Sequence, residues 1–293
     1  MRGQIAVTSD DIICSALRSQ DRTDPAEAAR IIHIAHRLAD AARVAILPHF
    51  RTGTLSAENK FAAGATSEGQ FDPVTAADHA AERAMRDILA KERPQDAILG
   101  EEFGKSDGTS GLTWVLDPID GTRGFIAGTP TWGVLIAAMD AQGAVYGLID
   151  QPYIGERFEG GLGRACMTGP HGTRALAACG DRALDAATVM TTFPAVGTAA
   201  EGAAFAEIAA RARIVRYGCD CYAYALLALG QVDLVIEAGL NAYDICAPIA
   251  VIEAAGGIVT NWQGGPAVDG GRVVAAAGRV QHDAALKVLS QVR

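Results

Sequence analysis

The sequence predicts a mixed α and β protein that contains two sheets of different kinds. Apolar runs separated by a short polar turn between residues 132 and 167 predict antiparallel strands, whereas short strands and helices alternate after about residue 187. Such alternation is typical of a mostly parallel sheet flanked by helices. Because 293 residues suffice for two packed halves around a cleft, we expect an N-terminal appendage over 1–23, an α+β half over 24–186 and an α/β half over 187–293.

Two helices are expected before the first sheet. The first begins after Asp24, an N-cap residue, with Pro25 at the first helical position, and apolar residues recur at helical spacing to about Leu47. The second begins at Thr75 and ends before Pro94.

The remaining elements follow from short apolar runs and the turns between them. In the first half we expect strands over 97–100, 132–139 and 144–149, a further strand that ends at Asp117, and a third pairing in the antiparallel series near 157–167. In the second half we expect strands over 188–193, 214–217, 232–237 and 258–260, and helices over 203–212, 222–229 and 245–255.

Charge and hydropathy exclude several classes of partner. The formal net charge is −9 and no block of Lys or Arg occurs, which argues against nucleic acid held through its phosphates. No apolar run approaches the roughly 20 residues that a bilayer helix needs, so we expect a soluble protein without a membrane partner. The first residues lack the sustained apolar core of a secretory signal, which makes the cytoplasm the expected location.

The segment from Trp114 to Thr122 carries the strongest chemical signal. An apolar, strand-like run ends there in Asp117-Pro-Ile-Asp120-Gly-Thr, which brings two carboxylates and one free carbonyl to the tip of a strand. Hard oxygen ligands of this kind suit Mg²⁺, and the backbone amides after the glycine suit a phosphate. Turn chemistry explains Asp-Gly, but it does not explain a second aspartate at the end of a buried strand.

Further carboxylates stand at the ends of other predicted elements: Asp78, Glu101, Glu102 and Asp244. Each has an ordinary structural explanation, since Asp78 and Asp244 suit the first turn of a helix and the glutamates suit a solvated turn. If they converge with the other two aspartates, however, each pair about 4 Å apart repels by about 4 kcal/mol at an effective dielectric constant of roughly 20. Convergence therefore implies bound cations, and without His or Cys in metal spacing these are Mg²⁺ or Mn²⁺ rather than zinc.

These motifs resemble a known family. Gly100-Glu101-Glu102, Asp117-Pro-Ile-Asp-Gly-Thr122 and Tyr243-Asp244 through Gly256-Gly257 are similar to the signatures of the inositol monophosphatase family of Mg²⁺-dependent phosphatases. The resemblance implies a layered α-β-α-β-α fold and a small phosphate monoester as substrate. It also implies a homodimer, the common state in that family.

The resemblance further implies a site with two Mg²⁺ ions, for which Mn²⁺ is an alternative. Glu101, Asp117 and the carbonyl of Ile119 would hold the first ion. Asp117, Asp120 and Asp244 would hold the second, so that Asp117 bridges the two. Most of these ligands fall in the α+β half.

For the reaction itself, the resemblance assigns roles to residues beside these ligands. The amides of Gly121 and Thr122 would bind the phosphate, and the Thr122 hydroxyl with Asp78 would orient and deprotonate the attacking water, supported by Glu102. The loop over 60–75, which contains Lys60, is long, and whether it carries a third ion is left open.

Within the family, Asp117 through Gly133, Asp150-Gln-Pro-Tyr153 and Glu156-Arg-Phe158 resemble the histidinol-phosphatase branch. The substrate positions then fall on Asp220 and Glu237, two acids that suit a cationic substrate such as histidinol phosphate. A strand-end acid bonded to solvent or backbone is the plainer explanation of Glu237.

Two alternatives remain at this point. Another phosphatase of the same family would act on inositol 1-phosphate or on a 3′(2′),5′-bisphosphate nucleotide, whose second phosphate would need a basic residue such as Arg123. An alternative of a different class is a non-catalytic, metal-dependent binding or regulatory protein.

Overall fold

The computed structural model describes residues 23–52, 57–59 and 73–292 of the chain. The helices are α1 (Pro25–Ile46), α2 (Ala76–Glu92), α3 (Thr122–Ala127), α4 (Ala199–Ala209), α5 (Asp220–Ala228), α6 (Ala242–Ala254) and α7 (Arg279–Leu289), with 3-10 turns at η1 (Leu47–His49) and η2 (Leu184–Ala186). The strands of the first part are β1 (Ala57–Asn59), β2 (Pro73–Thr75), β3 (Ala97–Gly100), β4 (Gly104–Ser106), β5 (Thr113–Asp120), β6 (Gly133–Asp140), β7 (Gly143–Gln151), β8 (Glu156–Gly161), β9 (Arg164–Gly169) and β10 (Gly172–Ala175). Those of the second part are β11 (Thr188–Thr191), β12 (Ile214–Tyr217), β13 (Leu234–Leu240), β14 (Ile258–Asn261) and β15 (Gly271–Ala276).

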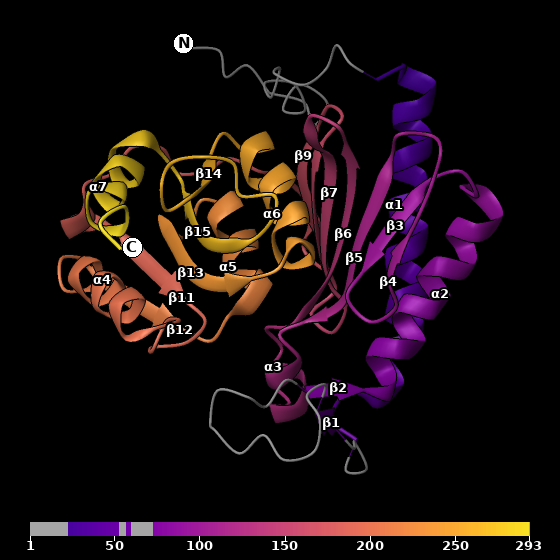
Figure 1. Cartoon of the computed structure of the whole chain (residues 1–293), viewed down its shortest axis with the longest axis horizontal. Helices are drawn as coiled ribbons and strands as arrows, with labels where there is room; N and C mark the ends of the chain where they lie inside the picture. Colours follow the sequence, from indigo (N-terminus) through magenta and orange to yellow (C-terminus); the bar gives the residue numbers. More distant parts are fainter. Residues whose placement is uncertain (1–22, 53–56, 60–72, 293) are drawn as a thin grey trace, which may run out of the picture.

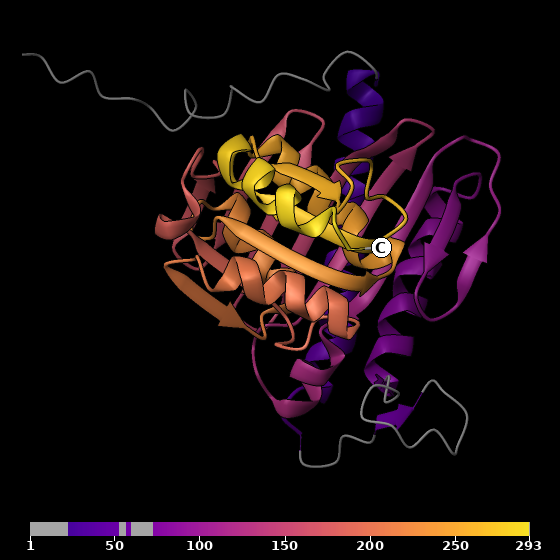
Figure 2. The same cartoon turned by 60° about the vertical axis from the view of Figure 1, so that its left-hand side comes forward.

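These elements form five layers, which confirms the predicted α-β-α-β-α arrangement (Figure 1). Helices α1 and α2 cover one face of an eight-stranded sheet, and α5 and α6 lie between that sheet and a five-stranded one. The turned view in Figure 2 shows α4 and α7, in orange and yellow, on the outer face of the smaller sheet. Three hydrophobic clusters fill the spaces between the layers, and the apolar faces of the helices are buried in them.

The larger sheet has the strand order β10-β9-β8-β7-β6-β5-β3-β4. Its pairings are antiparallel except for β3 with β5, which run parallel. The predicted hairpin over 132–149 is present as β6 and β7, and the third pairing near 157–167 consists of two strands, β8 and β9. The parallel pair matters for the site because it brings the carboxyl ends of β3 and β5 to the same edge of the sheet.

The smaller sheet has the order β12-β11-β13-β15-β14 and is mixed. Strand β11 runs parallel to both β12 and β13, whereas β15 pairs antiparallel with both β13 and β14. The prediction of a mostly parallel sheet was therefore wrong in detail, because two of its four pairings are antiparallel. Strand β15 and helix α7 were not identified from the sequence, and the insertion of β15 between β13 and β14 reverses the direction at that side.

Helix α6 lies unusually close to the larger sheet. A Cβ atom at Gly147 on β7 would overlap the carbonyl oxygen of Ala247, and one at Gly160 on β8 would lie within 2.5 Å of the Val251 Cα atom. Two glycines thus let the helix backbone approach the strands directly. This close packing fixes the position of α6, and therefore the position of Asp244 in its first turn.

None of the described helices is long and apolar enough to cross a membrane. The appendage over 1–23, apart from Thr23, and the part of the loop that contains Lys60 lie outside the described residues. The boundary between halves near residue 187 remains a prediction.

Candidate active site

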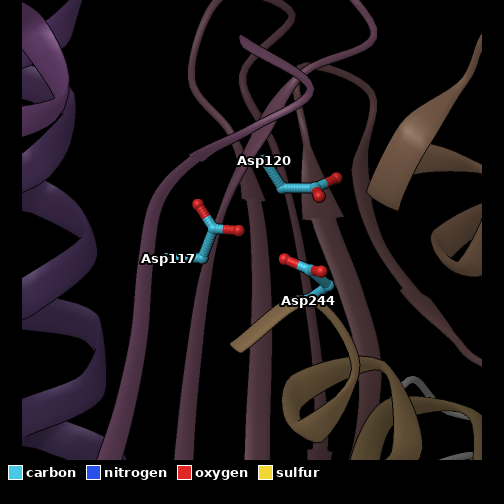
Figure 3. Close-up of side chains that lie close together, drawn as sticks. All are labelled: Asp117, Asp120 and Asp244. Atoms are coloured by element: carbon cyan, nitrogen blue, oxygen red, sulfur yellow. The ribbon is translucent and has the colours of Figure 1, made fainter. Parts of the chain in front are cut away.

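Asp117, Asp120 and Asp244 form a carboxylate cluster at one end of β5 (Figure 3). Each offers an oxygen, and these three oxygens lie within 4.8 Å of one another. Asp117 and Asp120 belong to β5, and Asp244 belongs to the first turn of α6, which begins after a capping box between Asn241 and Asp244. The sequence-predicted aspartates therefore do converge, from segments more than a hundred residues apart.

An irregularity in β5 places both of its aspartates on the same side. Asp117 pairs with Leu135 and Asp120 pairs with Gly133, so β5 advances by three residues where β6 advances by two. In a regular strand, residues three apart point to opposite faces, and one extra residue restores the same face. Pro118, which has no amide hydrogen to donate, stands within this bulge.

Burial and mutual repulsion raise the pKa values of these carboxyl groups. For Asp117 and Asp120 the pKa lies well above its usual value, first because of burial and then because of neighbouring acids. Burial raises the pKa of Asp244 to about 7, with a contribution from Glu101 that is opposed by the backbone hydrogen bond from Asn241. Such a gathering is unfavourable for the protein alone, and a divalent cation bound by hard oxygen ligands removes the repulsion. The residues present therefore fit a Mg²⁺ or Mn²⁺ site.

Glu101 joins this cluster from β3. Its backbone amide donates to the carbonyl of Leu116 at 3.1 Å, which continues the parallel pairing of β3 with β5 and sets Glu101 beside Asp117. The charge of Glu101 contributes to the raised pKa values of both Asp117 and Asp244. All four predicted metal-ligating carboxylates thus lie in one place.

The turn after Asp120 supplies backbone groups to the same site. The Thr122 hydroxyl donates to the carbonyl oxygen of Ile119 at 3.0 Å, and the Ile119 amide donates to Asp117 Oδ1 at 3.0 Å. Gly121 is the N-cap of the short helix α3 and has φ +85°, a left-handed conformation that favours glycine. A Cβ atom at Gly121 would also lie 2.9 Å from Asp220, so this glycine provides close approach as well as the turn.

Asp78 lies at the start of α2 with its two oxygens in different environments. Oδ2 accepts hydrogen bonds from the amide and the hydroxyl of Thr75, at 2.9 and 2.5 Å, whereas buried Oδ1 has no hydrogen-bond partner among the described residues. Burial raises the pKa of Asp78 to about 7 against the effect of the Thr75 bonds, and Glu102 and Glu101 raise it further. The nearby Glu102 carboxylate lies 3.3 Å from His79 Nε2. The predicted joint role of Thr122 and Asp78, which orient and deprotonate the attacking water, stays a prediction.

The predicted substrate residues Asp220 and Glu237 lie at the start of α5 and on β13, and Asp220 lies against the turn that follows β5. Asp220, which has a left-handed φ of +45°, lies over Gly121, and burial raises its pKa to about 6 against the opposing charge of Arg123. Glu237 on β13 accepts from the Thr192 amide at 2.6 Å and from the Thr191 hydroxyl at 3.2 Å. Burial raises the pKa of Glu237 to about 7, opposed by these bonds and increased by Asp220.

A hydrogen bond joins helix α5 to strand β5 at the cluster itself. The amide of Cys221, in the first turn of α5, donates to Asp120 Oδ2 at 2.6 Å. The helix N-terminus thereby orients a predicted metal ligand that belongs to the other half of the chain. The sequence gives no sign of this bond, because its partners lie 101 residues apart.

Sequence reasoning missed Glu82, a fully buried acid on α2 that accepts two backbone hydrogen bonds from the turn after β3. A signal was present, since Glu82 follows Asp78 by four residues and shares the apolar stripe of Ala81, Met85 and Leu89. An acid within the buried stripe of a helix needs a partner.

A layered α-β-α-β-α protein whose buried carboxylates converge on a divalent-cation site, beside a glycine turn at the start of a helix, has the features of a metal-dependent phosphatase. A model of the inositol monophosphatase family matches residues 27–293. The chain therefore belongs to the inositol monophosphatase family, which is metal-dependent, and the family makes it a phosphoric monoester hydrolase.

Individual relatives agree with this assignment. The chain is 33% identical over 273 residues to a histidinol-phosphatase from Streptomyces coelicolor, covering 89% of this chain and 97% of that protein. It is 40% identical over 239 residues to the chloroplastic bifunctional phosphatase IMPL2 of Arabidopsis thaliana, covering 80% of this chain and 65% of the plant protein's length. Among solved structures, an inositol monophosphatase from Zymomonas mobilis matches with a TM-score of 0.75 and 37% identity, covering 89% of this chain and 98% of the other.

Proposed function

We propose that this protein hydrolyses histidinol phosphate to histidinol and phosphate with the help of Mg²⁺. The observation that carries the choice of substrate is a pair of buried acids: Asp220, which lies over Gly121 and whose charge acts on Asp120, and Glu237, whose pKa Asp220 raises. When ionised, both acids carry a negative charge, which complements the ammonium and the imidazole of this substrate. The similarity to the Streptomyces histidinol-phosphatase over nearly its whole length supports the same choice.

Two Mg²⁺ ions are proposed, the first held by Glu101, Asp117 and the Ile119 carbonyl and the second by Asp117, Asp120 and Asp244. When bound, such ions lower the pKa of a coordinated water and stabilise the charge that develops on the leaving oxygen. Mn²⁺ is a chemical alternative for the same oxygen ligands.

The protein's own groups position the water and the phosphate. Asp78 Oδ2 is fixed by Thr75, which leaves Oδ1 to accept a proton from the attacking water. The amides of Gly121 and Thr122 hold phosphate oxygens, while the Thr122 hydroxyl and Glu102 orient the water. Direct attack by water is proposed, so that no phosphorylated side chain forms.

On the substrate side, Asp220 and Glu237 bind the cationic part of the molecule by charge-assisted hydrogen bonds. The charge of Arg123 opposes the effect of burial on the Asp220 pKa and so favours the ionised carboxylate. Binding energy from this distant part of the substrate places the phosphate over the ions.

The test compares phosphate release with Mg²⁺ from histidinol phosphate, inositol 1-phosphate and adenosine 3′,5′-bisphosphate, measured side by side. We expect histidinol phosphate to have the highest kcat/KM by at least about tenfold, the factor that about 1.4 kcal/mol of selective binding gives. A preference for either other substrate would make the protein an inositol-1-monophosphatase or a bisphosphate nucleotidase. No turnover of any of the three would favour the non-catalytic, metal-dependent regulator.

Two finer expectations, the cytoplasmic location and the homodimer, remain predictions, and whether the loop that contains Lys60 carries a third ion stays open. Sedimentation in the presence of Mg²⁺ tests the dimer. Metal counting on the purified protein tests the number of ions.

A further inference from the structure

Glu82 on α2 is a fully buried acid that the reaction described above does not use. It follows Asp78 by four residues and precedes Arg86 by four, so the three side chains share one face of the helix. That face lies against the β3–β4 turn (Figure 1). One helix face therefore carries a proposed proton acceptor at one end and a buried ion pair further along.

The Glu82 carboxylate holds the turn through two backbone amides. Oε2 accepts from the amide of Glu102 at 2.7 Å, and Oε1 accepts from the amide of Phe103 at 3.2 Å. Oε1 also accepts from Arg86 Nε at 2.7 Å. These three donors compensate the cost of burying the charge, and they fix the carboxylate in one orientation.

Arg86 also binds the turn, further along the chain than Glu82 does. Its guanidinium donates to the carbonyl of Gly104 and, at 3.0 Å, to the hydroxyl of Ser106. The turn that joins β3 to β4 is thus bound to α2 at its beginning by Glu82 and at its end by Arg86. A charged network with this many satisfied partners is rigid.

The strand side of the turn is shaped for the same carboxylate. A Cβ atom at Gly100, the last residue of β3, would overlap the Glu82 carboxylate. Glu101 then stands between two fixed points, since its own amide bonds to Leu116 of β5 and the next amide bonds to Glu82. The backbone on both sides of Glu101 is therefore held, by β5 on one side and by α2 on the other.

We propose that Glu82 is a positioning residue for the metal site, which aims the Glu101 side chain at Asp117 through the amides of Glu102 and Phe103. This inference rests on the proposed function, because it takes Glu101 as a metal ligand. Since Asp78 belongs to the same helix face, the network also fixes the distance between the proton acceptor and the ligand. Second-layer partners of this kind typically change metal affinity by about 10–100-fold when they are replaced.

The test is Glu82→Gln, which keeps the size of the side chain but replaces one accepting oxygen with a donor that faces a backbone amide. Mn²⁺ binding to the purified full chain is measured from the free Mn²⁺ signal in electron paramagnetic resonance, together with the Mg²⁺ concentration for half-maximal phosphate release. We expect the Kd for Mn²⁺ and the half-maximal Mg²⁺ concentration each to rise at least about tenfold. The activity at saturating Mg²⁺ should fall less than that.

Asp233→Asn provides a matched control on the smaller sheet. Asp233 is equally buried and accepts from the Thr188 amide at 2.7 Å, from Arg182 Nη1 at 3.2 Å and from Cys179 Sγ at 2.8 Å. We expect both variants to lower Tm and only Glu82→Gln to weaken Mn²⁺ binding. A Kd within twofold of that of the unaltered protein in folded Glu82→Gln would overturn the positioning role.

Two further measurements keep the result decisive. If Glu82→Gln fails to fold, Glu82→Asp takes its place, because it keeps the charge but moves the carboxylate one methylene away from the amides. An unchanged Mn²⁺ affinity in Glu82→Asp would also overturn the positioning role of Glu82. If the unaltered chain itself binds no Mn²⁺, the proposed function fails along with this inference. If it binds Mn²⁺ as tightly as Glu82→Gln does, only the inference fails.

Discussion

Asp117 lies among three other acids at the site, Glu101, Asp120 and Asp244, each of which raises its pKa. It is buried on β5, its pKa is raised first by burial and then by Glu101, Asp120 and Asp244, and the proposal makes it the ligand shared by both ions. A carboxylate in that position is unfavourable without cations and indispensable with them. Its replacement should therefore separate stability from activity.

We predict that Asp117→Asn lowers kcat for phosphate release by at least about a thousandfold, which corresponds to about 4 kcal/mol. Because the change removes a repelling charge, Tm in EDTA should stay the same or rise. Phosphate release and thermal unfolding measure the two effects. Asp140→Asn, at the half-buried end of β6, is the control that should leave both unchanged, because an asparagine oxygen still accepts from the Gln142 amide; substantial turnover by Asp117→Asn would exclude the bridging role.

Glu237 separates substrate recognition from catalysis. We predict that Glu237→Gln lowers kcat/KM for histidinol phosphate by about 10–100-fold, since a hydrogen bond to a charged group contributes about 1.5–3 kcal/mol. Hydrolysis of a plain aryl phosphate should change by less than about twofold, because that substrate has no cation to bind. Equal losses on both substrates would mean that Glu237 only holds the Thr191 hydroxyl and the Thr192 amide in place.

Individual residues could be predicted from the sequence where the residues around them carry a local signal. Residues whose role depends on tertiary contacts were missed. Asp117 and Asp120 stand at the end of an apolar strand, so burial and function were both readable. Glu82 carries a weaker mark, its place in the apolar stripe of α2, and only the structure shows that the amides of Glu102 and Phe103 are its partners.

Helix α1 is joined to the larger sheet by a polar network centred on Glu159 of β8. Glu159 is 6% exposed, and it accepts from the Tyr146 hydroxyl at 2.7 Å and from Cys166 Sγ at 3.1 Å, with His36 Nε2 at 3.2 Å. Burial alone would raise the pKa of Glu159, but these hydrogen bonds outweigh it and hold the pKa at about 2. The ionised carboxylate therefore stabilises the contact between the helix and the sheet.

We predict that Glu159→Gln lowers the free energy of unfolding by about 2–3 kcal/mol at pH 6. The pKa in the folded protein lies below that of the unfolded chain, so the contribution is complete above about pH 4.5 and is lost as the pH falls toward 2. Denaturant unfolding of both proteins at pH 6 and at pH 3.5 measures the difference, which should shrink at the lower pH. An equal difference at both pH values would contradict it, and Asp87→Asn on the exposed side of α2 serves as the control.

Elements with strong end signals were predicted well, whereas strand direction was not. The capping residues Asp24 and Thr75 mark the beginnings of α1 and α2, which the structure confirms. The alternation of apolar segments does not distinguish a strand that continues the parallel order from one that returns antiparallel, as β15 does. That choice is made by long-range pairing, which a local pattern does not contain.

For the whole molecule, the carboxylate cluster links metal binding, pH and stability. In the metal-free protein the folded-state pKa of Asp244 is about 7, far above that of an unfolded aspartate, and those of Asp117 and Asp120 are raised as well. The folded state then binds more protons than the unfolded state, so stability falls as the pH rises through this range. Mg²⁺ replaces those protons, and its stabilising effect should grow with pH.

We predict that 5 mM Mg²⁺ raises Tm relative to EDTA by about 5 °C at pH 8, as expected for an ion present at about 100 times its Kd. At pH 6 the rise should be clearly smaller. Thermal unfolding followed by calorimetry or fluorescence at both pH values tests this. NaCl at the same ionic strength as the Mg²⁺ solution is the control. An increase that is equal at pH 6 and pH 8 would contradict the assignment of the cluster as the metal site.

The arrangement of the two halves is the part of the molecule that the sequence could not supply. Apolar runs joined by a short turn predicted the larger sheet and the alternation of strands and helices predicted the smaller one, yet the bond from Cys221 to Asp120 and the packing of Asp220 on Gly121 depend on how the sheets stack. Stacking is decided by the buried surfaces of α5 and α6, whose residues are apolar on nearly every side and therefore give no direction.

The close packing of α6 on Gly147 and Gly160 limits which positions can be changed in protein engineering. Any side chain at either glycine would push against the helix backbone, and the helix would carry Asp244 with it. Libraries aimed at new substrates should therefore leave both glycines unchanged and randomise the β13 and α5 side, where Glu237 and Asp220 lie. Such libraries can change the substrate selectivity while the position of Asp244 is kept.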